Sequence, residues 1–346
     1  MKAFRMYGVD DLRLIDVPEP RLQPDEVLLR PLYTGVCSTD LHILYSGALV
    51  RELPVTLGHE FSATVVEVGP AMPVTEPYPR SRPLRIGDRV CVEPMLPCMR
   101  CYYCLRGRVN LCPHMRHLGI TQDGSLAELV RAPAARCTPL PEELTDQEGA
   151  LTEVLACGVN FVEAASIAPG DTVAVVGGGP MGQMAAQVAL ACGAERVVMS
   201  EPSPQRRDVA TRLGVHTTID AAAVDPVVAV RDLTAGRGAD VTLECVGLEQ
   251  AVQQALDMTR RGGCCVLGGV PVKPLRLTVD EIVLGEKRVV GAVASAWHFG
   301  TALALIVDRR VNPAGAISRE YAFADTRDAL RAAHERRDMC KLMIRH

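Results

Sequence analysis

The sequence predicts an α/β protein of two domains, the first rich in short strands and the second built on a doubly wound parallel sheet. Before about residue 150, apolar runs such as EVLLRPLYTGV (26–36) and SATVVEVG (62–69) are short and are separated by segments rich in proline and glycine. From DTVAVVGGG (171–179) onward, apolar strands alternate with alanine- and leucine-rich helical stretches, as in consecutive βαβ units. With 346 residues and 48% hydrophobic content, the chain can bury two cores.

The second half predicts a regular series of elements. Strands are expected at 172–176, 196–201, 241–247 and 264–270, and helices between them at 181–193, 205–214 and 251–263. The tail adds helices at 300–310 and 325–337, and it is too short to form a domain. In the first half a further strand is expected at 88–94, after the proline-rich segment 73–88, which we expect to be a surface loop.

Charge and composition exclude several classes of protein. The net charge is −4 and the basic residues are dispersed, so the basic patch that a nucleic-acid partner needs is missing. No apolar run is long enough to cross a membrane, and the N-terminus MKAFRMYGVDDLRL lacks the layout of a signal peptide. We therefore expect a cytoplasmic protein with a small-molecule partner. In that compartment thirteen cysteines indicate metal ligands or buried thiols rather than disulfides.

Four cysteines lie in one short loop, LPCMRCYYCLRGRVNLC (96–112), in a C-x2-C-x2-C-x7-C array. Four thiolates from one loop close a tetrahedral zinc site and leave no position for a substrate, which is typical of a structural metal. The alternative, four unpaired thiols at this spacing, would be an oxidation liability. We predict a structural zinc ion in a lobe at about 94–114, held by Cys98, Cys101, Cys104 and Cys112.

A glycine motif at the start of the second half indicates a dinucleotide site. In VAVVGGGPMG, Gly177, Gly179 and Gly182 fit G-x-G-x-x-G between a strand and a helix, where a pyrophosphate can approach the helix N-terminus. Glu201 closes the next predicted strand, at the place of an acid that binds the ribose hydroxyls. Such an acid repels a 2′-phosphate, so the pattern favours NAD, while Arg206 and Arg207 leave NADP open.

A second pair of metal ligands lies near the N-terminus. Cys37 in GVCSTDLH and His59 in GHEF belong to no closed cluster, so a zinc ion bound there would keep a coordination position for a substrate. Asp40 could accept the second ring N–H of His59 and fix its tautomer. On these residues alone, Cys37 and His59 are more often buried core residues than metal ligands.

The order of the motifs resembles that of zinc-dependent medium-chain alcohol dehydrogenases. GVCSTDLH, GHEFSATVVEVG, GDRV, the cysteine loop, DGSLAEL and VAVVGGGPMG follow one another as in that family, across essentially the whole chain. EPMLPCMRCYYCLRGRVNLC and Glu153 are similar to the polyol, butanediol and threonine dehydrogenase branch. The resemblance implies a GroES-like catalytic domain at 1–153, a Rossmann NAD-binding domain at 154–294, and a return to the catalytic domain at 295–346.

The resemblance also implies the ligands of a catalytic zinc ion. Cys37 and His59 match the two constant ligands, and Glu60 matches the adjacent carboxylate that can enter the coordination shell. Glu153 matches the fourth ligand or the partner of a bound water. Cys157, four residues later, is an alternative to Glu153. With the cysteine loop, two zinc ions per chain are expected.

A proton relay and cofactor contacts are implied in the same way. Thr39 matches the hydroxyl that takes the substrate proton, and His42 matches the histidine that passes the proton to solvent. Ala63 and Val154 depart from the family pattern, which has glycine and proline there, but neither removes a ligand. Further contacts to the dinucleotide are expected from Pro180, Met181, Val246 and Val270.

The expected function is therefore hydride transfer between a secondary alcohol, such as a polyol, diol, cyclitol or amino alcohol, and NAD, with zinc as Lewis acid. The alternatives are a primary-alcohol or aldehyde dehydrogenase of the same family, a zinc-free quinone reductase, a zinc-stabilised regulator and a non-catalytic NAD-binding zinc protein. Family members usually form dimers or tetramers through the Rossmann sheet edge. Residues expected near the substrate or nicotinamide are Leu44, Tyr45, Met95, Trp297 and His298.

Overall fold

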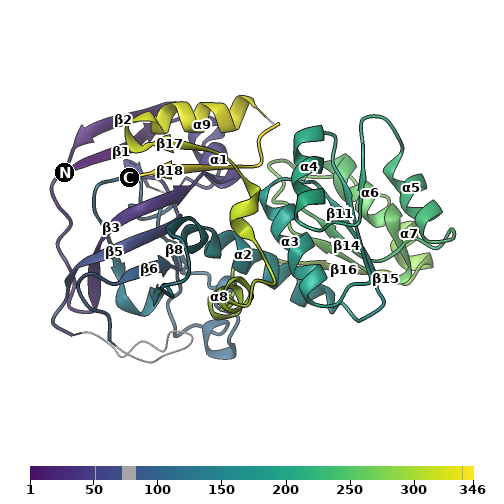
Figure 1. The fold of residues 1–346 in the computed structure, drawn as a ribbon, viewed down its shortest axis with the longest axis horizontal. Coiled ribbons are helices and arrows are strands. Elements are labelled where there is room, and N and C mark those ends of the chain that lie inside the picture. Colours follow the sequence, from purple (N-terminus) through teal and green to yellow (C-terminus); the bar gives the residue numbers. More distant parts are fainter. Residues whose placement is uncertain (51, 72–82, 337) are drawn as a thin grey trace.

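The computed structural model describes residues 1–50, 52–71, 83–336 and 338–346, and it places two domains side by side with both termini in the same one (Figure 1). The second domain is a six-stranded parallel sheet with the order β13-β12-β11-β14-β15-β16. In chain order β11 is the first of these strands, so this is the 3-2-1-4-5-6 order of a Rossmann sheet. The predicted doubly wound fold is confirmed.

The elements of the Rossmann domain follow the predicted order, but residues 259–263, expected to end a helix, begin strand β15, and four further elements at 217–219, 226–233, 280–284 and 288–291 were not predicted. Strand β11 is the β-branched run TVAVV, which is buried on both faces as a central parallel strand must be. The strands are β11 (Thr172–Val176), β12 (Arg196–Ser200), β13 (Thr217–Ile219), β14 (Ala239–Glu244), β15 (Thr259–Leu267) and β16 (Arg288–Gly291). The helices are α3 (Pro180–Ala191), α4 (Pro204–Arg212), α5 (Pro226–Leu233), α6 (Glu249–Met258) and α7 (Asp280–Leu284). Prolines at the first turn of α3, α4 and α5 suit positions that need no backbone N–H donor.

The first domain is built on a mostly antiparallel sheet with the order β10-β6-β5-β3-β18-β17, in which β9 also pairs with β3. The C-terminal strands β17 and β18 complete this sheet, because β18 pairs antiparallel with β3. The strands are β3 (Glu26–Gly35), β5 (Glu60–Val68), β6 (Arg89–Val92), β9 (Val130–Pro133), β10 (Cys137–Pro139), β17 (Ile317–Ala322) and β18 (Lys341–Arg345). A smaller sheet contains β1 (Lys2–Gly8), β2 (Asp11–Asp16) and β4 (Val55–Thr56).

Shorter elements surround these two sheets. The cysteine lobe contains β7 (Met95–Leu96), β8 (Arg116–His117) and the 3-10 helices η1 (Cys104–Arg106) and η2 (Val109–Leu111). Helix α1 (Ser38–Ser46) follows β3, and η3 (Ala134–Arg136) precedes β10. The C-terminal segment forms α8 (Phe299–Val307), η4 (Pro313–Ala316), η5 (Phe323–Asp325) and α9 (Thr326–Glu335). Most of the predicted loop at 73–88 lies outside the described residues.

Helix α2 (Asp146–Ala165) joins the two domains (Figure 1). Thr145 and Glu148 form a capping box at its start, in which the Thr145 side chain accepts from the N–H of Glu148 and the Glu148 carboxylate accepts from the N–H of Thr145. The helix packs against β5 and β6 on one side and against α3 and α8 on the other. The expected boundary between residues 153 and 154 therefore falls inside a continuous helix.

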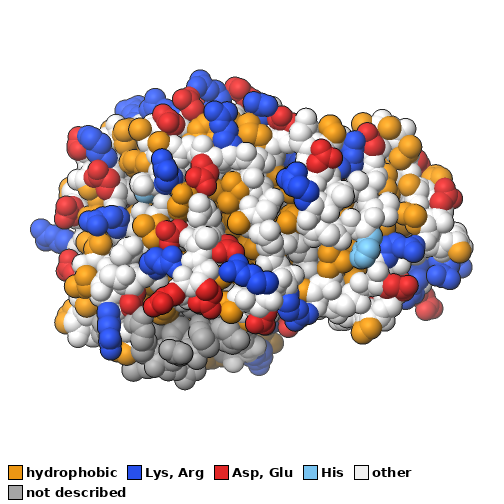
Figure 2. Space-filling model, viewed as in Figure 1, with side chains coloured by type: hydrophobic (Ala, Val, Ile, Leu, Met, Phe, Trp, Pro, Cys, Tyr) orange, Lys and Arg blue, Asp and Glu red, His pale blue; other side chains and the backbone are white. Residues whose placement is uncertain are grey.

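The visible surface carries both signs of charge. Figure 2 shows Lys and Arg side chains interspersed with Asp and Glu over this face of the molecule. Within the described part of the chain, no helix combines the length and the apolar character that a membrane span requires.

Candidate functional site

The first candidate metal ligand lies where strand β3 leads into helix α1. Cys37 is the N-cap of α1, and its backbone N–H donates to Oδ2 of Asp40, 3.0 Å away, in a capping box. This hydrogen bond fixes the first turn of α1. The Asp40 side chain is buried, at 1% exposed.

His59 and Glu60 reach the same point from the beginning of strand β5. The ligand atoms of Cys37, His59 and Glu60 lie within 4.8 Å of one another. Nδ1 of His59 lies 3.2 Å from Oδ1 of Asp40, which leaves Nε2 for a metal. A thiol, an imidazole and a carboxylate are the donor set that zinc takes at catalytic sites, so these residues fit a zinc ion with an open position.

Lys341, the first residue of β18, was not expected at this site. Its Nζ contacts Oε2 of Glu60 and donates to the carbonyl oxygen of Val36 at 3.0 Å. Lys341 and Glu60 side chains are each 1% exposed. No local pattern identifies this pair, because its members lie 281 residues apart in the sequence.

Glu153 approaches the three ligands from helix α2 but is not one of the group that lies within 4.8 Å. The Cys157 thiol, one turn later, donates to Oε1 of Glu153 at 3.6 Å. Burial and the charge of Glu60 raise the pKa of Glu153 to about 7. Burial and the charge of Glu153 also hold the pKa of Cys157 well above its usual range. This arrangement favours Glu153 as the partner of a bound water over direct ligation by either side chain.

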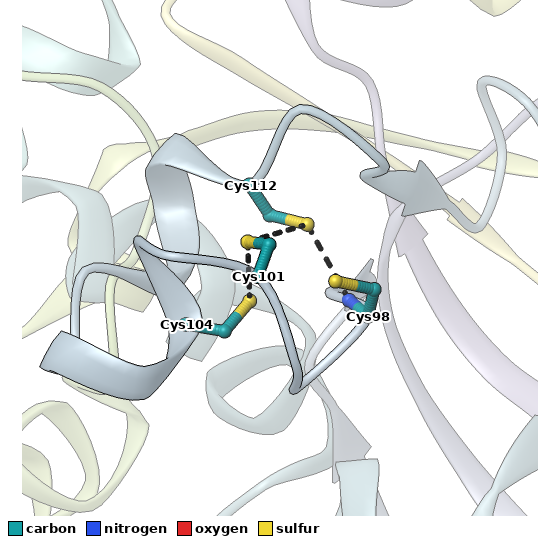
Figure 3. Close-up of side chains that lie close together, drawn as sticks. All are labelled: Cys98, Cys101, Cys104 and Cys112. Carbon is teal, nitrogen blue, oxygen red and sulfur yellow. Dashed lines mark hydrogen bonds between the residues drawn. The ribbon is translucent and has the colours of Figure 1, made fainter.

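The four thiols of the predicted structural site converge in the lobe (Figure 3). Sγ of Cys101 lies 3.5 Å from Sγ of Cys104 and 3.9 Å from Sγ of Cys112. The N–H of Cys98 points at Sγ of Cys112, 3.4 Å away. Four sulfurs bound tetrahedrally to zinc at ~2.3 Å stand about 3.8 Å apart. The observed spacing therefore fits a closed zinc site.

The two expected relay residues lie on successive turns of α1. Thr39 is half-buried, next to Cys37, whereas His42 is exposed. Partial burial, followed by the nearby His334, lowers the pKa of His42. His334 comes from α9 and stacks on Tyr45, with the ring centroids 4.1 Å apart. The helix thus leads from the thiol of Cys37 toward solvent.

The glycine motif forms the turn between β11 and α3. Gly177 has φ of +98°, which favours glycine, and a Cβ on Gly182 would collide with the carbonyl oxygen of Gly177. A Cβ on Gly179 would meet no atom nearer than 4.0 Å, so the space in front of the N-terminus of α3 is open. Pro180 occupies the first helical position. The turn therefore has the shape required to receive a pyrophosphate.

Glu201 lies at the end of β12 and is 4% exposed. Its Oε2 accepts from the N–H of Gly178 at 2.7 Å, and its Oε1 accepts from the N–H of Ser203 at 2.8 Å. Arg206 Nη1 lies 3.8 Å from Oε2 of Glu201, and its Nε donates to the carbonyl oxygen of Met339. Arg207 instead pairs with Asp220.

One candidate metal ligand, Cys37, and the first residue of α3, Pro180, line the same cavity. This cavity of about 50 Å³ is lined by Cys37, Pro180 and Arg206, among others. Val246 and Val270 follow strands β14 and β15 and are exposed at their carboxyl ends. Met181 is half-buried on α3. A dinucleotide on the glycine turn would therefore lie on the same side of the molecule as Cys37.

The residues expected near the substrate or nicotinamide have different surroundings. Leu44 is in the core, and Met95 pairs in register with His117. Trp297 is 48% exposed and has φ of +72°, with the guanidinium of Arg136 over its ring.

His298 forms an ion pair with Glu163, at 3.0 Å. His117 carried no sequence signal, yet its ring centroid lies 5.5 Å from that of His59. Burial followed by the charge of His59 lowers the pKa of His117 to about 3.

Comparisons with known proteins cover the whole chain. A family model of the alcohol dehydrogenase GroES-like domain matches residues 23–142, and one of zinc-binding dehydrogenases matches residues 180–308. A sorbitol dehydrogenase of Halalkalibacterium halodurans is 35% identical, covering 94% of each chain. A sorbitol dehydrogenase of Bacillus subtilis is 30% identical, covering 99% of this chain and 97% of that protein.

Two solved structures extend the comparison. A zinc-binding dehydrogenase of Sinorhizobium meliloti bound to NADP superposes with a TM-score of 0.92 and 31% identity, covering 100% of this chain and 99% of that one. The 2R,3R-butanediol dehydrogenase of Bacillus subtilis superposes with a TM-score of 0.89 and 28% identity, with the same coverage. The likeness therefore extends over both domains.

Proposed function

This chain belongs to the family of zinc-dependent medium-chain alcohol dehydrogenases, and from this premise we propose that it oxidises a secondary alcohol group of a diol or polyol, with NAD as hydride acceptor. It is an oxidoreductase with a small-molecule alcohol substrate. The named relatives support the substrate class, since sorbitol and butanediol both carry neighbouring hydroxyl groups.

One observation carries the proposal. Cys37, His59 and Glu60 bring their ligand atoms within 4.8 Å of one another, and the cavity beside Cys37 reaches Pro180 at the glycine turn. A bound alcohol and a bound dinucleotide would therefore meet at one place, which hydride transfer requires.

The chain's own residues would hold zinc and move the proton. Cys37, His59 and Glu60 would bind the metal, which supplies Lewis acidity toward the alcohol oxygen when present. The Thr39 hydroxyl would accept the alcohol proton, and His42 would pass it to water. Glu153, whose pKa is about 7, would hold a water beside the metal.

A second zinc ion would bind the lobe, which makes two per chain. Cys98, Cys101, Cys104 and Cys112 would enclose it completely, so its role would be to hold the loop together rather than to react. The sulfur spacing of the lobe supports this assignment.

NAD is the proposed cofactor in preference to NADP. Glu201 stands beside the glycine turn with a buried carboxylate, where a 2′-phosphate would meet its charge. Arg206 is close enough to offset part of that repulsion. One relative was solved with NADP bound, so NADP is the alternative cofactor to compare with NAD.

We also propose a homodimer or homotetramer in the cytoplasm. Strand β16 is the outer strand of the Rossmann sheet, and its Val289 and the nearby Val293 are exposed. An exposed apolar edge strand is a surface that pairs readily with a second copy. The thirteen cysteines are all free thiols, as a reducing compartment would keep them.

A substrate screen tests the proposed function. Zinc-loaded protein is mixed with NAD and with diols, polyols, cyclitols, amino alcohols and simple primary alcohols, and NADH absorbance is followed. We expect turnover with secondary alcohols that carry a neighbouring hydroxyl, and none in Cys37→Ser. Turnover with primary alcohols alone would assign the chain to a different substrate class, and no turnover with any alcohol would contradict the proposal.

A further inference from the structure

Lys341 is a buried cation at the candidate zinc site. Its side chain is 1% exposed, and Nζ is held by the carboxylate of Glu60 and by the carbonyl oxygen of Val36 at 3.0 Å. A buried ammonium group persists only when it is paired and hydrogen-bonded, because its desolvation is costly. One carboxylate oxygen of Glu60, Oε2, is therefore committed to Lys341.

The surrounding backbone is shaped to admit this pair. A Cβ on Gly35 would overlap Oε2 of Glu60 and would stand 2.9 Å from Cε of Lys341. Gly35 lies in β3 and pairs in register with Glu60 on one side and with Met343 on the other. The absence of a side chain at this position leaves room for the ion pair between two neighbouring strands.

We propose that Lys341 is a positioning residue of the catalytic zinc site, which holds Oε2 of Glu60 so that this carboxylate can offer the metal no more than one oxygen. The inference rests on the proposed function, because it takes Cys37, His59 and Glu60 as the site. A carboxylate released from Lys341 could bind zinc through both oxygens. That would occupy the coordination position that the alcohol needs.

The acidic groups around Lys341 provide a second reason to expect that it limits how the metal is bound. Cys37, Glu60 and Glu153 all lie close enough to Lys341 to act on its charge. Lys341 is thus a fixed positive charge among acidic groups that a metal cation would also attract. Removing it should strengthen metal binding, by roughly tenfold, even as it slows turnover.

The experiment compares three variants with the unchanged protein. Lys341→Met removes the charge at similar length, and Lys341→Arg keeps a cation that can hold a carboxylate. Lys287→Met is the matched control. Lys287 is also buried, at 7% exposed, but its Nζ donates to the carbonyl oxygen of Leu256 in the Rossmann domain.

The readouts are the visible spectrum of cobalt at the catalytic site and the affinity for zinc in competition with a chelator. In Lys341→Met, the cobalt bands should weaken and shift, as higher coordination numbers cause, and zinc should bind about tenfold more tightly. Lys341→Arg should restore the parental spectrum, and Lys287→Met should leave it unchanged. Cys37→Ser identifies the bands that belong to this site.

Two results would overturn the inference. Cobalt bands that depend on Cys37 but are identical in Lys341→Met would show that Lys341 does not position Glu60. Weaker zinc binding in Lys341→Met would assign Lys341 a merely structural role. Bands that do not depend on Cys37 would instead remove the proposed metal site, and the inference with it.

A second comparison applies if Lys341→Met does not fold. The double variant Lys341→Met/Glu60→Gln removes both buried charges, so it avoids an unpaired carboxylate. If Lys341 acts through Glu60, the cobalt spectrum of the double variant should equal that of Glu60→Gln alone. A difference between these two spectra would contradict the proposal.

Discussion

Asp40 places its two carboxylate oxygens on two different partners, and one of them, Oδ1, lies 3.2 Å from Nδ1 of His59. The other, Oδ2, accepts from the N–H of Cys37. A single side chain therefore orients one candidate zinc ligand and fixes the helix turn that carries another. Burial raises the pKa of Asp40, but His59, the N–H of Cys37 and the charge of Lys341 together outweigh it, and the net pKa is lowered.

We expect Asp40→Asn and Asp40→Ala to differ in stability but not in metal affinity. Asparagine keeps an oxygen that can accept from the N–H of Cys37, so the fold should be kept, whereas alanine removes this hydrogen bond and should cost about 1 kcal/mol. Both remove the charge that faces His59, so zinc affinity should fall roughly 10- to 100-fold in each. Chelator competition and denaturant unfolding measure the two effects, and unchanged affinity in Asp40→Asn would count against the orienting role.

The two zinc sites should respond differently to loss of one thiol. Metal analysis should find two zinc ions per chain in the unchanged protein and one in each of Cys101→Ser and Cys37→Ser. Cys101→Ser should lower the melting temperature because it opens a closed site, whereas Cys37→Ser should abolish turnover with the fold intact. One ion per chain in fully active protein would refute the two-site assignment.

Cofactor preference should depend on Glu201. We expect the unchanged protein to favour NAD over NADP by about tenfold or more in kcat/KM. Glu201→Ala should narrow this preference, but it also releases the N–H groups of Gly178 and Ser203. Glu201→Gln removes the negative charge but keeps a side-chain oxygen that can accept from one of these N–H groups. It therefore tests the effect of the charge on cofactor preference more directly than Glu201→Ala. Equal or better kinetics with NADP in the unchanged protein would reverse the assignment.

The proton path should separate Thr39 from His42. Thr39→Val should reduce turnover by several orders of magnitude, since it removes the hydroxyl that takes the alcohol proton, while zinc and NAD binding stay nearly unchanged. His42→Gln should cost less, because water can reach its exposed position, and small buffer bases should restore the lost rate. If His42→Gln keeps full activity and the parental pH profile, the relay ends at Thr39.

Acid should destabilise the protein through His346. Its Nε2 lies 2.9 Å from Oγ1 of Thr34, and burial lowers its pKa from 6.5 to about 4. A histidine with a lowered folded-state pKa contributes stability above pH 6.5, and this stability is lost as the pH falls toward 4.

Between pH 7 and pH 5, the unchanged protein should lose about 2 kcal/mol of its free energy of unfolding through His346. His346→Gln should not show this loss, and denaturant unfolding at both pH values measures the difference. The exposed His114, changed to Gln, is the control. Parallel pH curves for the unchanged protein and His346→Gln would show that His346 does not contribute.

The sequence predicted the local features of the site better than the distant ones. The cysteine lobe was predictable because its ligands lie within one loop, and chain spacing limits how far such ligands can separate. Cys37 and His59 were predicted as a site only through resemblance, because a cysteine and a histidine at this spacing are more often core residues. The pair of Lys341 and Glu60 left no trace, since it joins strands at opposite ends of the chain.

The elements of the fold were also predicted well where a local pattern marks them and missed where none does. Strands β11 and β12 and helix α3 were predicted within a residue or two, because apolar runs, glycine and proline define their ends. Helix α2 was missed, because its face toward each domain is buried and the polar stripe that would reveal a helical period is short. Strand β18 is also buried at four successive positions, so it shows no alternation.

Helix α2 also limits how this protein can be divided. It packs against β5 and β6 of the first domain and against α3 of the second, and it carries Glu153 close to His59 and Glu60. A first domain that ends before α2 would expose the residues of β5 and β6 that the helix covers. A second domain that begins after α2 would expose the face of α3 that the helix covers. Exchange of a dinucleotide domain with a relative should therefore succeed only when the partners share compatible residues along α2. The helix, rather than either sheet, is therefore the element on which the packing of both domains in such a chimera would depend.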